Sequence, residues 1–186
     1  MQWKMKSKAM KREYSRIIQE AFETGFSYEK AYKGCAQCTF AALQEILDLS
    51  NSQTDAVCKA ATGLSGGMGS EGDGSCGAYS GSILMIGYIV GRERSDLKDV
   101  EGIRFTTNKI VRDLHSCFIQ EYGTIICHGI QRKIFGRPYY LPDEDQHRKF
   151  DEAAAHTEKC PYVVGKGVEW TVQILNTWRL LKPTGG

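Results

Sequence analysis

The chain has 186 residues and a mass of 20.8 kDa, enough for one domain (1–186) with its own hydrophobic core. Hydrophobic residues make up 41% and charged residues 25%, and the formal net charge is only +2 with acids and bases interspersed, which speaks against a nucleic-acid partner. No run approaches the ~18 apolar residues of a membrane span, and the charged first residues lack a signal peptide's apolar core, so we expect a cytoplasmic protein.

The first part of the chain is predicted to be helical. Apolar residues at helical spacing predict a helix over about 8–23, which Gly25 is expected to end. A second helix is expected over about 36–48, and a third from Ser52, Thr54 or Asp55 to Gly63. These three segments account for the chain up to its glycine-rich part.

The stretch from Gly63 to Gly81 contains eight glycines, which indicates unusual dihedrals or close backbone approach. It holds the sequence Gly74-Ser75-Cys76-Gly77-Ala78-Tyr79-Ser80-Gly81 and leads into an apolar segment that ends near Val90. That segment fits a buried strand or a buried helix. We favour a helix whose glycines permit close contact with a neighbour.

The second part of the chain continues the helical pattern. Long and short helices are expected over about 97–122 and 127–135, with Gly123 as the break between them. Acidic residues at 143–145 suit the start of a helix through Ala155, and the last helix is expected to begin at Pro161. With no alternating strand pattern, the prediction is an all-α, irregular bundle of six to eight helices with a glycine-rich loop.

Four of the seven cysteines fall at predicted helix starts. In a reducing compartment an odd number of cysteines favours metal binding or redox chemistry over a disulfide framework. The four are Cys35, Cys76, Cys127 and Cys160, the last expected to be an N-cap because proline favours the first helical position. Cys58 and Cys117 lie inside predicted helices and are expected to be packing residues.

A helix start changes the chemistry of a thiol. Unpaired N–H groups and the helix dipole stabilise a thiolate, and they can also donate hydrogen bonds to the sulfurs of an iron–sulfur cluster. Four thiolates match the ligand count of such a cluster or of a structural zinc. We therefore expect the four sulfurs to lie around a common centre.

The chain resembles the C_GCAxxG_C_C family of redox-active proteins, which is named for a C…CGAxxG…C…C cysteine pattern. The motif stands here as Cys76-Gly77-Ala78-Tyr79-Ser80-Gly81, with Gly34-Cys35-Ala36-Gln37 before it and with Cys127 and Cys160-Pro161 after it. The resemblance covers about residues 20–180. It implies a small helical protein whose four cysteines carry a prosthetic group such as an iron–sulfur cluster. A similar helical domain occurs in split-Soret cytochromes, but Cys35-Ala36-Gln37-Cys38 is followed here by Thr39, so no C-x-x-C-H haem motif is present.

Three functions follow from these observations. The first is electron transfer or redox sensing, with a cluster or other metal on Cys35, Cys76, Cys127 and Cys160, a protein redox partner, and a homo-oligomer left open. The second is metal-free thiol–disulfide exchange, with Cys35 and Cys76 as the catalytic pair or with Cys38 as the partner of Cys35. The third is a non-enzymatic helical module stabilised by zinc or by packed cysteines. His128, beside Cys127, is a candidate ligand or proton carrier, whereas His115, His147 and His156 are expected to have no site role.

Overall fold

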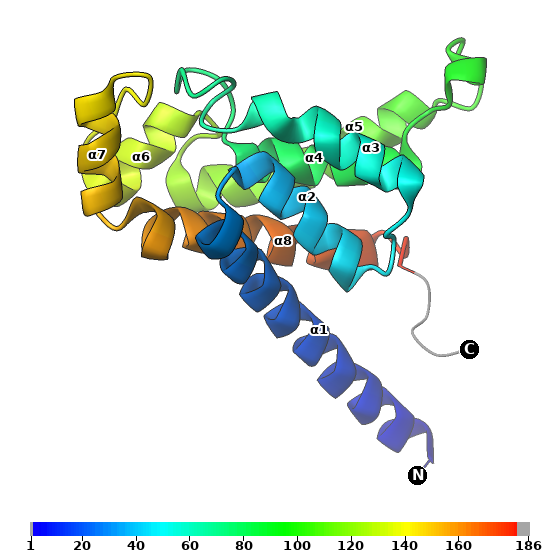
Figure 1. Ribbon diagram of the computed structural model, residues 1–186. Helices are drawn as coiled ribbons and strands as arrows, with labels where there is room; N and C mark the ends of the chain where they lie inside the picture. Colours follow the sequence, from blue (N-terminus) through cyan, green and yellow to red (C-terminus); the bar gives the residue numbers. More distant parts are fainter. Residues whose placement is uncertain (1, 182–186) are drawn as a thin grey trace.

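The protein is a bundle of α-helices. The computed structural model describes residues 2–181, with side chains from residue 14 onward. Over this range it contains eight α-helices and no β-strand, which confirms the all-α prediction (Figure 1). The helices are α1 (Gln2–Tyr32), α2 (Cys35–Ile46), α3 (Ser52–Ala60), α4 (Gly77–Val90), α5 (Ile103–Tyr122), α6 (Cys127–Phe135), α7 (Glu144–Glu152) and α8 (Cys160–Thr177).

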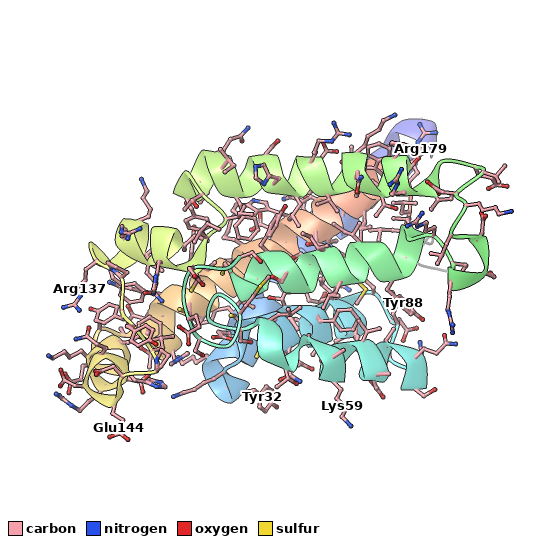
Figure 2. All side chains as sticks on the ribbon, turned by 90° about the horizontal axis from the view of Figure 1, so that it is seen from above. Tyr32, Lys59, Tyr88, Arg137, Glu144 and Arg179 are labelled. Carbon is pink, nitrogen blue, oxygen red and sulfur yellow. The ribbon has the colours of Figure 1, made fainter. Side chains whose placement is uncertain are left out.

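Two hydrophobic clusters of unequal size organise the bundle. The larger forms where α1, α2, α4, α5 and α8 meet, and its fully buried side chains include Phe40, Met85, Phe118 and Val168. Figure 2 shows α4 and α5 running alongside each other with α8 crossing behind them. The smaller cluster centres on Tyr139, Phe150 and Ala155, at the end of the molecule that holds α6 and α7 (Figure 1).

Helix α1 continues through Gly25, so the expectation that this glycine ends the helix is wrong. A Cβ at Gly25 would lie 2.7 Å from Val168 Cγ2 and 3.1 Å from the Cα of Gly165, and a Cβ at Gly165 would lie 2.8 Å from the Phe22 carbonyl oxygen. The two glycines therefore let α1 and α8 cross in close contact. Glycine at position 25 permits this close packing and does not end the helix.

The segment 77–90 is helical, as preferred over a strand, and its glycines lie where α4 crosses α2. Gly77 and Gly81 are four residues apart and share one helix face. A Cβ at Gly77 would overlap Cys35 Sγ, and a Cβ at Gly81 would overlap the carbonyl oxygen of Ala36. These two positions of the CGAxxG motif thus set how closely the cysteine-bearing end of α2 approaches α4.

Other predicted boundaries also differ from the structure. Helix α3 ends at Ala60, and a 3₁₀ turn (Ala61–Leu64) spans the expected end at Gly63. Helix α5 begins at Ile103 rather than near Leu97, because a short 3₁₀ turn (Arg94–Asp96) and the left-handed Gly102 (φ 69°) precede it. The expected helix over 143–155 is α7, which begins with the Asp143 carboxylate accepting from the Gln146 N–H at 2.9 Å and which ends at Glu152. The short helix over 127–135 lies as predicted.

We expect Gly81→Ala to destabilise the fold by about 1–3 kcal/mol, the usual cost of forcing an extra methyl group into a packed contact. Its Cβ would overlap the Ala36 carbonyl and lie 2.9 Å from Thr39 Cβ. Gly87, in the same helix, is the matched control, since its Cβ would meet no atom within 4 Å. Gly87→Ala should be neutral or should stabilise by up to about 1 kcal/mol. Urea unfolding of both variants measures the difference, and equal midpoints would contradict the packing account.

Candidate functional site

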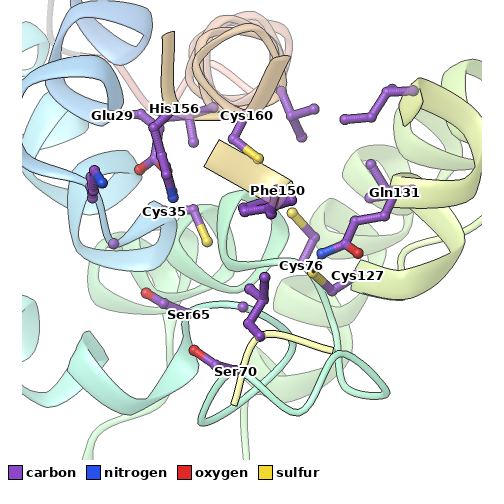
Figure 3. A pocket seen from close by; sticks show the side chains of 18 of the residues that line it. Glu29, Cys35, Ser65, Ser70, Cys76, Cys127, Gln131, Phe150, His156 and Cys160 are labelled. Atoms are coloured by element: carbon purple, nitrogen blue, oxygen red, sulfur yellow. Dashed lines mark hydrogen bonds and ion pairs between the residues drawn. The ribbon is translucent and has the colours of Figure 1, made fainter. Parts of the chain in front are cut away.

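A cavity of about 220 Å³ lies where the two hydrophobic clusters meet, and Cys35, Cys76, Cys127 and Cys160 all line it. Each comes from a different element: the starts of α2, α6 and α8 and the residue before α4. Figure 3 shows the four side chains around the same space, together with Glu29, Phe150 and His156. The fold thus brings four cysteines that are far apart in the sequence to one cavity.

Cys35 has the most polar surroundings of the four sulfurs. The Cys76 thiol donates a hydrogen bond to the Cys35 sulfur, and the backbone N–H groups of Gly66 and Gly77 point to it as well. These donors lower the pKa of Cys35 against the opposing effects of burial and of the Glu29 carboxylate. The pKa of Cys35 is therefore lowered, but all three donors lie outside α2, and only the Gly77 N–H belongs to a helix start, that of α4.

The glycine-rich loop fixes the position of Cys127 through backbone hydrogen bonds. The N–H groups of Cys127 and His128 donate to the carbonyls of Gly74 and Gly72, at 3.0 and 2.8 Å, and the Cys76 N–H donates to Ile125 at 2.8 Å. The amides that open α6 are therefore used by the loop. The Cys127 sulfur instead accepts from Gln131 Nε2 at 3.6 Å, and Gln131 Oε1 accepts from the Tyr139 N–H at 2.7 Å.

Cys160 is not an N-cap, which corrects the sequence prediction. A π-helical turn (Ala155–Lys159) runs directly into α8, and Lys159 before Cys160 is itself helical. Pro161 has no N–H to donate to the turn before it, so a wider turn is tolerated there. The turn begins after Ala154, which adopts the left-handed region (φ 61°). Cys160 therefore reaches the cavity from within a continuous helical segment.

Burial is the main influence on the pKa of Cys127 and of Cys160. It raises the pKa of Cys127 to about 12 and raises the pKa of Cys160 well above its ordinary value. For Cys76, donation to Cys35 is the first cause of the raised pKa and burial is the second. The surrounding apolar side chains, which include Ile130, Phe150, Val163 and Val164, explain this desolvation.

No three of the four sulfurs lie close enough to one another to bind a single ion together without rearrangement. A tetrahedral zinc with Zn–S bonds of ~2.3 Å holds its sulfurs about 3.8 Å apart. Among the residues the structure describes, the one group of three or more His, Cys, Asp or Glu side chains compact enough to share an ion is His147, Asp151 and His156. The cysteines form no such group, although all four line the cavity.

The remaining cysteines do not line the cavity. The Cys38 thiol is buried and donates to the carbonyls of Lys33 (2.9 Å) and Tyr28 (3.5 Å) at the end of α1, and burial raises its pKa. Cys58 and Cys117 lie within α3 and α5, where they pack against the larger cluster as expected. All seven cysteines are free thiols in the structure.

The histidines that line the cavity are not the one that the sequence suggested. His128, the candidate beside Cys127, turns away from the cavity: its Nε2 lies 3.1 Å from the Tyr139 carbonyl, and its ring fills the space that a Cβ on Gly72 would occupy. His147 and His156, which the sequence gave no reason to select, do line the cavity, as does the buried Glu29. Glu29, His147 and His156 form no recognisable sequence motif, because α1, α7 and the π turn come together only in the folded chain.

These features define a helical protein with an apolar, cysteine-lined cavity. A comparison with protein families matched residues 33–174 to the family described as "Putative redox-active protein (C_GCAxxG_C_C)". The chain belongs to this family. Its own motif has cysteine before glycine, at Cys76-Gly77, where the family name prints Gly-Cys. No curated protein and no solved structure matched the chain. Within the described part of the chain, no helix has both the length and the apolar character needed to cross a membrane.

In the reduced protein without cofactor, we expect Cys35 to react with iodoacetamide at lower pH than an ordinary cysteine. Cys76→Ala removes the largest cause of the lowered pKa and should move the reaction to higher pH. Because the folded pKa lies below the unfolded one, Cys35 contributes stability above the unfolded pKa, and this contribution is lost as the pH falls through the folded pKa. Mass spectrometry of alkylated peptides follows each cysteine. The profile of Cys117 serves as the control and should not move, and an unchanged Cys35 profile in Cys76→Ala would contradict the assignment.

Proposed function

We propose that Cys35, Cys76, Cys127 and Cys160 bind an iron–sulfur cluster and that the protein transfers electrons to a protein partner or senses redox state in the cytoplasm. The observation that carries the proposal is the convergence of four cysteines from four elements on one apolar cavity. Membership in a redox-active family supports it. The free state of all seven cysteines fits a reducing compartment.

The donor set suits a polynuclear cluster better than zinc. Different irons bind different thiolates in such a cluster, so its ligands lie further apart than the ligands of one ion. No three of the four sulfurs lie close enough to share one ion, which agrees with this. Four cysteines are also the usual ligand number of [2Fe–2S] and [4Fe–4S] clusters.

A bound cluster would accept and release single electrons. The residues of this chain would tune that exchange in two ways. The Gln131 amide and the N–H groups of Gly66 and Gly77 donate hydrogen bonds to the sulfurs of Cys127 and Cys35, and such donors raise a cluster's reduction potential. Phe150, Val163 and Val164 limit the access of water to the cavity.

After anaerobic reconstitution, we expect the protein to contain iron and sulfide and to show visible absorbance that bleaches on reduction. Cys127→Ser and Cys160→Ser should each bind markedly less iron, because a hydroxyl is a poor replacement for a thiolate ligand. Cys58→Ser and Cys117→Ser are matched controls outside the cavity and should retain the wild-type iron content. A colourless protein without iron after reconstitution would exclude the cluster, and a single zinc that depends on the same four cysteines would replace it.

The contact between Cys35 and Cys76 favours a second candidate, a metal-free thiol–disulfide oxidoreductase. The two thiols are already hydrogen-bonded to each other. In this reaction the Cys35 thiolate attacks a disulfide of a partner protein, forming a mixed disulfide and releasing one partner thiolate. Cys76 then attacks the Cys35 sulfur, releasing the second thiolate. Two electrons pass from the cysteine pair to the partner, whose disulfide becomes two thiols after protonation.

A redox titration with thiol trapping tests this second candidate. In the iron-free protein, Cys35 and Cys76 should change from thiols to a disulfide together, at one defined potential. Cys35→Ser and Cys76→Ser should each abolish the transition, because neither partner can form the bond alone. Cys38→Ser is the control, since the Cys38 thiol is directed to the carbonyls of α1, and it should leave the transition unchanged. A disulfide between Cys35 and Cys38 in place of this pair would contradict the candidate.

A further inference from the structure

Three potential metal ligands with nitrogen and oxygen donors meet beside the cysteine-lined cavity. His147 and Asp151 lie one turn apart on α7, and His156 follows on the π-helical turn. One ligand atom from each lies within 4.8 Å of the others, and His156 Nε2 is 3.6 Å from Asp151 Oδ1. Ligands bound to one ion at ~2.1 Å in tetrahedral geometry are about 3.4 Å apart, so small side-chain rotations would bring the three donors to that spacing.

A buried carboxylate stands behind His156. Glu29 is 1% exposed, and its Oε1 lies 3.5 Å from His156 Nδ1. Neither Glu29 Oε2 nor His156 Nδ1 has a hydrogen-bond partner among the described residues. A buried carboxylate oxygen without a hydrogen bond is costly, and a histidine that binds a metal through one ring nitrogen commonly donates the other N–H to a carboxylate. Glu29 is placed to accept that N–H.

We propose that His147, Asp151 and His156 bind a divalent transition-metal ion, with Glu29 as the residue that orients His156. Two imidazoles and one carboxylate are a common ligand set for zinc and for non-haem iron(II), and three protein ligands leave a coordination position open for water or a substrate. Asp151 can contribute Oδ1, because its other oxygen, Oδ2, faces Lys33 Nζ at 3.8 Å.

This site differs in chemistry from the cysteine set. Imidazole and carboxylate ligands bind borderline and hard divalent ions, whereas thiolates favour iron–sulfur clusters and soft ions. The two sets are nevertheless close, since His147 and His156 line the same cavity as the four cysteines. A bound ion would therefore place a fixed positive charge at the cavity wall. The proposal does not depend on whether the cysteines carry a cluster.

Anaerobic titration of the reduced, metal-free protein with Co²⁺ tests the site. Cobalt bound to nitrogen and oxygen ligands shows only weak d–d absorption, whereas cobalt bound to thiolates adds intense charge-transfer bands. We expect one equivalent of Co²⁺ to bind without the thiolate bands. No binding, or binding that appears only together with thiolate bands, would overturn the proposal.

Variants assign the ligands. Asp151→Asn and His147→Gln change exposed side chains and should remove the thiolate-free Co²⁺ binding, as should His156→Gln. His115→Gln is the matched control, because His115 lies on α5 outside the cavity, and it should bind Co²⁺ as the wild type does. Circular dichroism verifies that each variant is folded. Retained binding in Asp151→Asn and His147→Gln would assign the ion elsewhere and overturn the site.

Glu29→Gln tests the positioning role separately. Residues that orient a metal-bound histidine typically contribute 10–100-fold to metal affinity, so a loss of that size in calorimetric titration is expected, with the d–d bands shifted rather than absent. An unchanged affinity and spectrum would overturn the role of Glu29.

Discussion

The close approach of Cys35 to the backbone of Gly77 determines the geometry of the cavity. The sulfur of Cys35 lies where a side chain at residue 77 would begin, and a Cβ there would also be 2.6 Å from the Ala36 nitrogen. Any residue other than glycine would push α2 away from α4. The same contact brings the Gly77 N–H to the Cys35 sulfur and brings Cys76, one residue earlier, into hydrogen-bond contact with it. The packing of α2 against α4 and the lowered pKa of Cys35 therefore both depend on glycine at position 77.

The glycine-rich loop extends this arrangement to α6. Its carbonyls at Gly72 and Gly74 accept the first two amides of α6, and Cys76 donates back to Ile125. The space beside Gly67 is equally restricted, since a Cβ there would lie 2.9 Å from Cys127 Cβ. Backbone pairing therefore places Cys127 relative to Cys76 without any strand or long helix between them. Cys160 is positioned differently. It lies between the π-helical turn (Ala155–Lys159) and Pro161, in a continuous helical segment.

Much of the fold could be predicted from the sequence, because helical periodicity is a local property. The helix over 127–135 and the helical state of 77–90 are examples. The predictions for Gly25 and Cys160 were wrong because both applied local rules for helix ends. The α1–α8 crossing determines the role of Gly25, and the π-helical turn determines the position of Cys160. The four cysteines were identifiable from their motif. Glu29 and His156 were not, because they lie 127 positions apart and only the packing of α1 near the π turn brings them together.

The charge of Glu29 connects the cysteines with the proposed metal site. The Glu29 carboxylate opposes ionisation of Cys35 and Cys160 and so acts to raise the pKa of both thiols. At Cys35 the hydrogen-bond donors outweigh this effect, and the net pKa is lowered. A cation held next to Glu29 would offset that repulsion and so favour thiolates across the cavity. Linkage requires the converse: ionised or cofactor-bound cysteines would change the affinity for the cation by the same factor. The sign depends on the charge that the cysteine set carries when loaded. A net negative cluster would strengthen cation binding at His147, Asp151 and His156, because the two charges would share one apolar cavity.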